Sequence, residues 1–251
     1  MLSIVVAVLS GVIVGALFRL TGVTHSVAGA ITPGVIAFVI AVIILMRRIG
    51  KMINPVVEEA QRHLQGGRQE LALKSLRDGL RFKSWHPLLA PQLHTQIGLL
   101  LYAQGDTDGA LEELKQASNR PWESPAFLGC AYFKKRDEAG MVKAFEKAVK
   151  VGEKDDLSWT VYAWCLQSRD KKAEATAVLK RAVAKLPANE RLKNNLELVT
   201  EGKKMKVAPY GDRWARFGLD GSVATGGREI PKSMRGFAQR PGFRQRPQRK
   251  R

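Results

Sequence analysis

The side chains best suited to catalysis or metal binding are few and widely separated in this sequence. Cys130 and Cys165 form no CxxC pair, and no histidine stands near either of them at the spacing of metal ligands. No histidine belongs to an HExxH or similar metal-binding pattern. We therefore predict two reduced cysteines, buried among helices as small apolar residues, with no metal ion and no cofactor. The four histidines are His25, His63, His86 and His94.

The sequence also contains none of the glycine patterns that bind phosphate groups or present a nucleophile. The patterns GxxxxGK[ST], GxGxxG and GxSxG do not occur in it. A glycine-rich stretch at residues 221–227 is followed by no helical pattern, so it cannot place a phosphate at a helix N-terminus. These observations predict that the protein is not an enzyme and has no catalytic residue.

Positive charge is concentrated at the C-terminal end. The chain has 41 Lys and Arg residues and 23 Asp and Glu residues, for a net charge of +18, and residues 202–251 hold 14 of the basic and three of the acidic residues. Residues 205–251 are rich in Arg, Gly, Pro and Gln, which predicts a mostly disordered basic tail. Such a tail suits phosphate groups of anionic lipid or nucleic acid, and an acidic protein surface is a third alternative. The last basic residues are Lys232, Arg235, Arg240, Arg244, Arg246, Arg249, Lys250 and Arg251.

One stretch near the start of the tail has a different character. Residues 210–219 carry Trp214 and Phe217 three positions apart, so both aromatic side chains would lie on one side of a helical turn. This spacing predicts a short helix that docks either on the preceding domain or on a membrane.

Two apolar segments open the chain. Residues 2–20 and 26–46 contain a single charged residue, Arg19, and each segment is long enough to cross about 30 Å of hydrocarbon as a helix. The intervening residues 21–25 leave room only for a turn. We therefore predict a transmembrane hairpin over residues 1–48. A cleaved signal peptide is the competing interpretation of the first segment, but a basic n-region is missing from it.

Flanking charges and small residues set the expected topology. A basic cluster at residues 47–51 follows the second span, which predicts a multi-pass protein of a bacterial-type inner membrane with both termini in the cytoplasm. Ala7, Gly11 and Gly15 recur at every fourth position of the first span and permit close helix contact. Their neighbour is either the second span or another copy of the chain, so a homo-oligomer stays an open alternative.

Residues 53–204 contain a helix-turn-helix pattern four times. The small residues of the four first helices are separated by 38, 31 and 34 positions, and those of the second helices by the same three intervals. Agreement between two independent helices on irregular intervals indicates true repeats. A final helix at about residues 189–204 would cap the array. The residues at these positions are Ala60, Gly98, Gly129 and Ala163 in the first helices and Ala72, Ala110, Met141 and Ala175 in the second, where Met141 stands at a position that is usually small.

The clearest copy spans residues 155–189, where Trp159, Tyr162 and Ala163 share one face of the first helix and Pro187 closes the unit. These residues match the W-x2-L-G-x2-Y, A-x3-F and P signature, so the segment resembles the tetratricopeptide repeat (TPR) family. The resemblance implies an all-α, right-handed superhelix of helix pairs with a concave groove that binds proteins or peptides. A helical bundle without repeat geometry is the alternative.

In that family, the groove is lined mainly by first-helix residues opposite the seam of each pair. Tyr102 and Phe133 would occupy equivalent places in adjacent repeats and form an apolar strip with Trp164, unless these aromatic residues are buried between repeats. The set lacks the several Lys, Arg and Asn residues with which some members hold a terminal carboxylate, so we expect a hydrophobic or amphipathic segment as ligand. The implied groove residues are Gln61, Leu64, Thr95, Leu99, Tyr102, Cys130, Phe133, Lys134, Trp164 and Gln167.

The sequence as a whole predicts a membrane-anchored adaptor or scaffold that binds partner proteins or peptides on the cytoplasmic face. The alternative function is a nucleic-acid or ribosome tether acting through the Arg-rich tail, with the repeats as a spacer. The salt dependence of binding separates the two hypotheses, because affinity that depends on phosphate contacts falls steeply as the salt concentration rises.

Deleting residues 231–251 is expected to leave the helical array folded, because these residues have no apolar periodicity and would bury little surface. Binding of the protein to vesicles that contain anionic lipid is expected to fall both with the deletion and with rising salt. Circular dichroism and vesicle co-sedimentation measure the two effects. Vesicle binding that the deletion leaves unchanged at low salt would show that the tail does not bind lipid.

Overall fold

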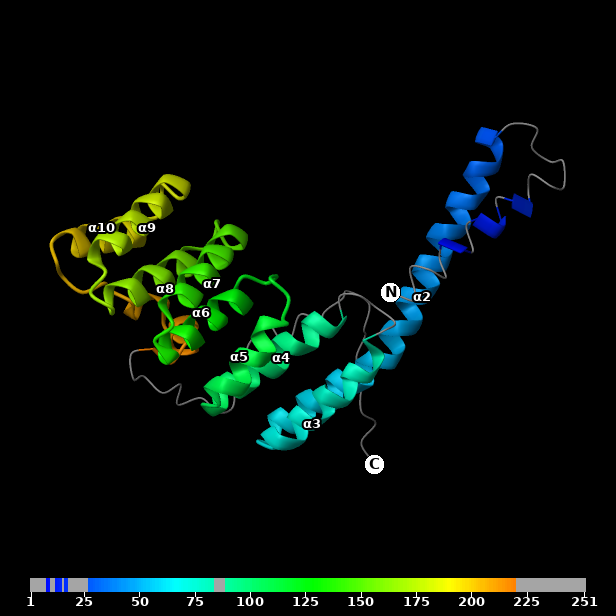
Figure 1. Ribbon diagram of the computed structural model, residues 1–251, viewed down its shortest axis with the longest axis horizontal. Helices are drawn as coiled ribbons and strands as arrows, with labels where there is room; N and C mark the ends of the chain where they lie inside the picture. Colours follow the sequence, from blue (N-terminus) through cyan, green and yellow to red (C-terminus); the bar gives the residue numbers. More distant parts are fainter. Residues whose placement is uncertain (1–7, 10–11, 15, 18–26, 84–88, 220–251) are drawn as a thin grey trace, which may run out of the picture. The chain divides into compact units, whose positions relative to one another are not determined.

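The computed structural model describes residues 8–9, 12–14, 16–17, 27–83 and 89–219. Within these residues every regular element is a helix, which confirms the predicted all-α class (Figure 1). The chain divides into two compact units, and the division falls between Leu93 and His94.

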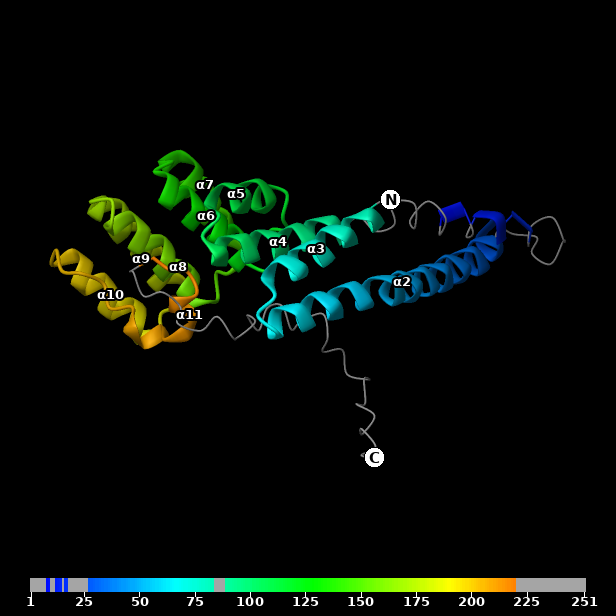
Figure 2. The same ribbon diagram turned by 90° about the horizontal axis from the view of Figure 1, so that it is seen from below.

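The first unit contains a pair of helices of unequal length. Helix α2 (Val27–Gln65) and helix α3 (Gln69–Gly79) are joined by a turn in which Gly67 has a φ of 71°. Helix α3 lies beside the C-terminal part of α2 in Figures 1 and 2. The predicted seam residues Ala60 and Ala72 are both buried, as close packing of the two helices requires. A 3-10 turn, η1 (Leu80–Phe82), follows α3.

Helix α2 corrects the predicted membrane topology. It continues without a break through residues 47–62, where charged side chains such as Lys51 and Glu58 are exposed, and the predicted domain boundary at residue 48 falls inside it. No helix in the described part of the chain is both long enough and apolar enough to cross a membrane. This finding contradicts the predicted multi-pass location in an inner membrane with both termini in the cytoplasm. Most of the predicted span 2–20 lies outside the described residues.

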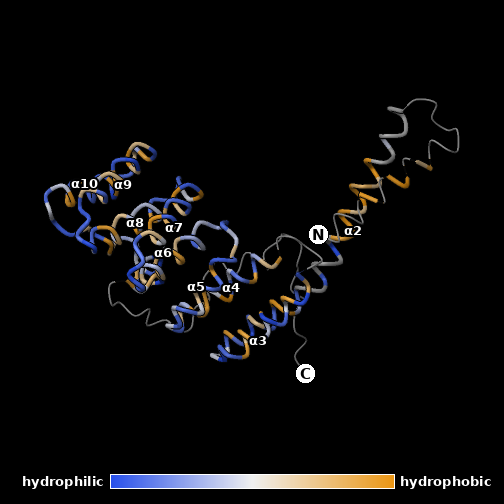
Figure 3. Tube along the Cα trace, in the orientation of Figure 1, coloured by the Kyte–Doolittle hydropathy of each residue, from blue (hydrophilic) through white to orange (hydrophobic). Residues whose placement is uncertain are grey.

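The apolar part of α2 is nevertheless exposed in the structure. Figure 3 shows hydrophobic residues along this helix, and Ile36, Ile40 and Ile44 are each about half accessible to solvent.

The second unit is a series of helix pairs with a repeat-like arrangement. The first helix of each pair is followed directly by the second, and the pairs follow one another along the array in Figure 1. Each first helix packs on its own second helix, and α6 also packs on α8. The helices are α4 (Leu89–Gln104), which crosses the division between the units, α5 (Thr107–Lys115), α6 (Glu123–Lys135), α7 (Glu138–Val151), α8 (Asp156–Gln167), α9 (Lys172–Lys185) and α10 (Glu190–Thr200).

Short polar side chains fix where several of these helices begin. Asp106, Asp137, Asp155 and Asn189 each accept a hydrogen bond from a backbone N–H of the first turn of α5, α7, α8 and α10, respectively. Such capping bonds satisfy donors that have no partner inside the helix, each at a gain of about 1 kcal/mol. The sequence thus sets the start of these helices locally, before any pair is packed.

The seams between paired helices explain the small residues found in the sequence. A Cβ atom on Gly98 would lie 2.7 Å from Cγ of Leu114, and one on Gly129 would lie 2.8 Å from Cδ2 of Phe145. In the next pair, Ala163 of the first helix is fully buried, and so are Ala175, Leu179 and Ala182 of the second helix. In the first two of these pairs, Leu114 and Phe145 of the second helix therefore lie directly against the backbone of the first helix. This contact recurs at the intervals predicted from the sequence.

More residues beyond α10 are folded than the composition of this part of the chain predicts. Residues 205–219, predicted as the beginning of the tail, form the 3-10 turn η2 (Ala208–Tyr210) and the short helix α11 (Asp212–Ala215). Both lie against the second unit, which confirms the prediction of a short helix docked on the array. Figure 2 labels α11 close to α8 and α10.

Replacing Gly129 by Ala is expected to destabilise the second unit by about 1–3 kcal/mol, because the added methyl group has no room beside the Phe145 ring. Chemical denaturation measures the change in the free energy of unfolding. The variant Phe145→Leu is the control, since it removes the ring that the added methyl group would meet. The double variant with Gly129→Ala and Phe145→Leu should lose less free energy of unfolding than the two single variants lose in sum. A gain in stability from Gly129→Ala, as helix propensity alone would give, would contradict the close seam.

Candidate functional site

The C-terminal segment, residues 203–219, covers one face of the second unit. We call this face the inner face: it is the surface of α4, α6, α8 and α10 that the segment contacts. The chain leaves α10 through Gly202, which has a φ of 76°, a conformation that glycine adopts at little cost. It then passes α10 and α8 and ends beside α6 and α4.

Two side-chain amides of the inner face bind the backbone of the segment. Gln167 of α8 donates from Nε2 to the carbonyl of Lys203 over 2.7 Å and accepts from the N–H of Met205 over 3.1 Å. Asn195 of α10 accepts from the N–H of Lys206 over 2.8 Å and donates to the carbonyl of the same residue over 3.3 Å. Each amide thus satisfies one donor and one acceptor of the segment's backbone, a contact that does not depend on the side chains of the segment.

Three aromatic side chains of the segment, spaced by four and three positions, are buried on the inner face. Tyr210 shares a hydrogen bond of 2.9 Å with the hydroxyl of Thr160 in α8. The Trp214 ring meets the Trp164 ring edge-on, with 5.4 Å between the ring centroids. The third residue, Phe217, is 2% exposed.

Phe217 lies in an aromatic cluster at the far end of the segment. Its ring stacks on Phe127 of α6 at 4.6 Å and lies 6.3 Å from the Trp122 ring. The backbone carbonyl of Phe217 accepts a buried hydrogen bond of 2.6 Å from the hydroxyl of Tyr102. Ring stacking and a backbone hydrogen bond therefore fix the same residue of the segment.

Burial controls the protonation of the hydroxyl groups in this interface. It raises the pKa of Tyr210 to about 12, although the hydrogen bond with Thr160 opposes the shift. Burial is also the main cause that raises the pKa of Tyr102 far above its ordinary value, with the nearby thiol of Cys130 adding to the shift. Both tyrosines are therefore neutral hydrogen-bonding groups throughout the physiological pH range.

One ion pair and one longer-range charge interaction involve the residues that precede Trp214 and Phe217. The guanidinium group of Arg213 lies 2.6 Å from Oδ2 of Asp155, the residue that caps α8. Arg216 is half-buried, and burial lowers its pKa, while the negative charge of Glu123 at the start of α6 opposes the shift. Asp155 and Glu123 thus place negative charge near Arg213 and Arg216, respectively.

The ten residues implied by the family resemblance do not all reach this interface. Tyr102, Trp164 and Gln167 contact the C-terminal segment directly. Phe133 is half-buried beside Trp164, with 6.0 Å between the ring centroids. Lys134 holds its ammonium group 3.9 Å from the Tyr102 ring centroid, and burial lowers its pKa.

The other implied residues have structural surroundings of their own. Thr95 accepts a hydrogen bond from the N–H of Ser118, and Leu99 is buried. Cys130 is a buried thiol beside Cys165. Burial raises the pKa of the Cys165 thiol. Gln61 and Leu64 are half-buried on α2, in the other unit.

The predicted apolar strip is therefore covered rather than open. Neither sequence-based alternative describes Tyr102 in full. Tyr102 is not exposed in an open groove, and neighbouring repeats alone do not bury it, because the chain's own C-terminal segment lies on it. Phe127 and Thr160 were not among the implied residues, although they stand one helical turn before Cys130 and Trp164 on the same helix faces. Extending the predicted face by one turn would find both.

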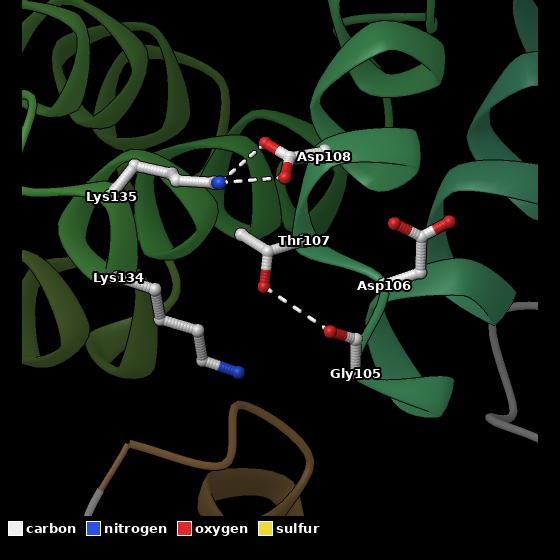
Figure 4. A pocket seen from close by; sticks show the side chains of 6 residues that line it. All are labelled: Gly105, Asp106, Thr107, Asp108, Lys134 and Lys135. Carbon is white, nitrogen blue, oxygen red and sulfur yellow. Dashed lines mark hydrogen bonds and ion pairs between the residues drawn. The ribbon is translucent and has the colours of Figure 1, made fainter.

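A polar hollow lies where α6 ends beside the start of α5 (Figure 4). Lys135 binds both carboxylate oxygens of Asp108 there, at 2.5 and 2.7 Å. The hydroxyl of Thr107 donates to the carbonyl of Gly105 over 3.4 Å. Most polar groups of the hollow thus satisfy one another. The six lining residues are Gly105, Asp106, Thr107, Asp108, Lys134 and Lys135.

The implied basic tail site, Lys232 to Arg251, lies outside the described residues. No model of a known protein family matches this sequence, and a search of curated proteins gave no match either.

Replacing Asn195 by Ala is expected to release the start of the C-terminal segment, because the variant loses both hydrogen bonds to Lys206. The expected cost is about 1–3 kcal/mol, since backbone groups of the segment lose their buried partner. Hydrogen–deuterium exchange at residues 203–219 should accelerate in the variant.

The exposed neighbour Asn194 provides the matched control, because Asn194→Ala changes the same helix and the same residue type without touching the segment. Equal exchange rates in the two variants would show that Asn195 does not hold the segment.

Proposed function

We propose that the second unit is a scaffold that binds extended segments of partner proteins on its inner face. The observation that carries this proposal is the C-terminal segment itself. It lies on the inner face through two amide–backbone contacts and three buried aromatic residues, which are the contacts that peptide-binding surfaces use. In this proposal the chain's own segment occupies the surface that a partner would use.

The contacts favour recognition of a polypeptide over recognition of a small molecule. Gln167 of α8 and Asn195 of α10 each bind one donor and one acceptor of a backbone. Aromatic pockets at the far end supply apolar area and a defined orientation. Backbone contacts would give affinity for any extended segment, and the pockets would select particular side chains.

We further propose that the array belongs to the TPR type. The repeated intervals between small residues support this, as do the helix pairs whose seams close on Gly98 and Gly129. In such an array each pair buries its apolar face only against its neighbours, so the first helices together form one continuous surface. Binding is then the function that the architecture favours, with no catalytic step.

The test uses the full-length chain with Trp214→Ala and Phe217→Ala in its own segment, which we call the open variant. A fluorescent peptide with the sequence of residues 203–219 is added in trans, and anisotropy reports binding. The open variant is expected to bind the peptide at least about tenfold more tightly than the natural chain. In the natural chain the tethered segment competes at an effective concentration of roughly millimolar.

A peptide with both aromatic residues replaced by Ala is the control ligand, and circular dichroism verifies that the open variant is folded. If the double substitution unfolds the array, Asn195→Ala serves as a milder open variant. A folded open variant that does not bind the natural peptide would contradict the proposed function.

A further inference from the structure

We propose that the inner face selects partner segments with the pattern Arg-aromatic-x-Arg-aromatic, through the carboxylates of Asp155 and Glu123. This inference rests on the proposed function and specifies the partner. The pattern is that of residues 213–217, where Arg213 precedes Trp214 and Arg216 precedes Phe217.

The first carboxylate is held in place before any ligand arrives. Oδ1 of Asp155 accepts a hydrogen bond of 3.0 Å from the N–H of Leu157 and caps α8. Its other oxygen, Oδ2, lies 2.6 Å from Nη2 of Arg213. A carboxylate fixed by a capping bond loses little conformational entropy when it binds a guanidinium group. Asp155 therefore presents a preformed site for the first arginine.

The second carboxylate faces a less solvated arginine. Glu123 lies in the first turn of α6, next to Trp122, whose ring stands 6.3 Å from Phe217. Oε2 of Glu123 is buried and has no hydrogen-bond partner among the described residues. Arg216 immediately precedes Phe217 and is half-buried; burial lowers its pKa, and the negative charge of Glu123 opposes that shift in part. A neutral residue opposite Arg216 would leave a partly buried charge without compensation, which is costly.

The aromatic residues set the spacing between the two arginines. Trp214 lies on Trp164 of α8, and Phe217 lies on Phe127 of α6, so consecutive pockets come from adjacent first helices. Trp214 lies in α11, a single turn of helix, and Phe217 follows two residues after that turn ends. Each arginine is one position before its ring, and the two carboxylates lie at the starts of the same two helices, Asp155 at α8 and Glu123 at α6.

The cations of the same face bind other groups. Arg191 lies over the Tyr210 ring at 5.4 Å and reaches Asp156 at 3.6 Å. The ammonium group of Lys134 lies over the Tyr102 ring. These two cations are engaged with aromatic rings and with Asp156, so neither is an ion-pair partner of Asp155 or Glu123.

The expected occupant is a segment of a different protein rather than a second copy of this chain. The chain's own segment is joined to α10 by a few residues around Gly202, so it returns to the inner face at an effective concentration of roughly millimolar. An identical segment from a second copy makes the same contacts and cannot displace it at micromolar concentration. A partner must carry the pattern together with contacts that the internal segment lacks.

The experiment measures peptide affinity for the open variant and for the open variant with Asp155→Asn and Glu123→Gln added. Asparagine keeps the capping oxygen at position 155, so only the charges change. The peptide of residues 203–219 is expected to bind the neutralised protein roughly tenfold more weakly. A peptide in which glutamine replaces both arginines should bind the two proteins equally, and higher salt should narrow the difference for the natural peptide.

Three results would overturn the proposal, each in a distinguishable way. Equal affinity of the natural peptide for both proteins would refute charge selection and leave the proposed peptide-binding function intact. Lack of binding to a folded open variant would refute the function and with it this inference. Concentration-dependent dimers of the natural chain at micromolar concentration, seen by sedimentation, would show that the occupant is a second copy.

Discussion

Burial of Tyr210, Trp214 and Phe217 is the interaction that gives the inner face its present form. Apolar side chains of this size leave water at a gain of about 1.5–3 kcal/mol each, which is enough to hold a segment that has little regular structure of its own. The amides of Gln167 and Asn195 satisfy the backbone that this burial would otherwise leave without partners. Because the two contributions act on one short segment, the array and its C-terminal segment form a single structure.

Local sequence signals were sufficient to predict the array. The matching intervals between residues such as Gly98 and Gly129 predicted the seams, because the second helix of each pair approaches the first closely at these glycines. The continuity of α2 was not predicted, because a run of apolar residues before residue 47 obscures the fact that the same helix continues through charged residues. Apolar periodicity does not locate the end of this helix, and α2 also continues through Gly50 and Pro55, which are residue types that often end a helix.

The interface with the C-terminal segment was predicted only in part. Tyr102, Trp164 and Gln167, which the repeat register places on one face, do contact the segment. Asn195 was missed because it lies in α10, the helix that ends the array. Asp155 was missed because a residue that caps a helix start does not stand out as a binding residue. That the ligand of this surface is part of the same chain follows from tertiary contacts across more than 100 residues, such as that from Tyr102 to Phe217, which no local pattern encodes.

The central claim of this account is that the C-terminal segment occupies the inner face in the natural protein. Nuclear Overhauser effects between aromatic protons measure it most directly in solution. The account predicts cross-peaks between the Trp164 and Trp214 rings and between the Phe127 and Phe217 rings, whose centroids lie 5.4 and 4.6 Å apart. Absence of these cross-peaks, together with narrow and poorly dispersed resonances for residues 205–217, would contradict it.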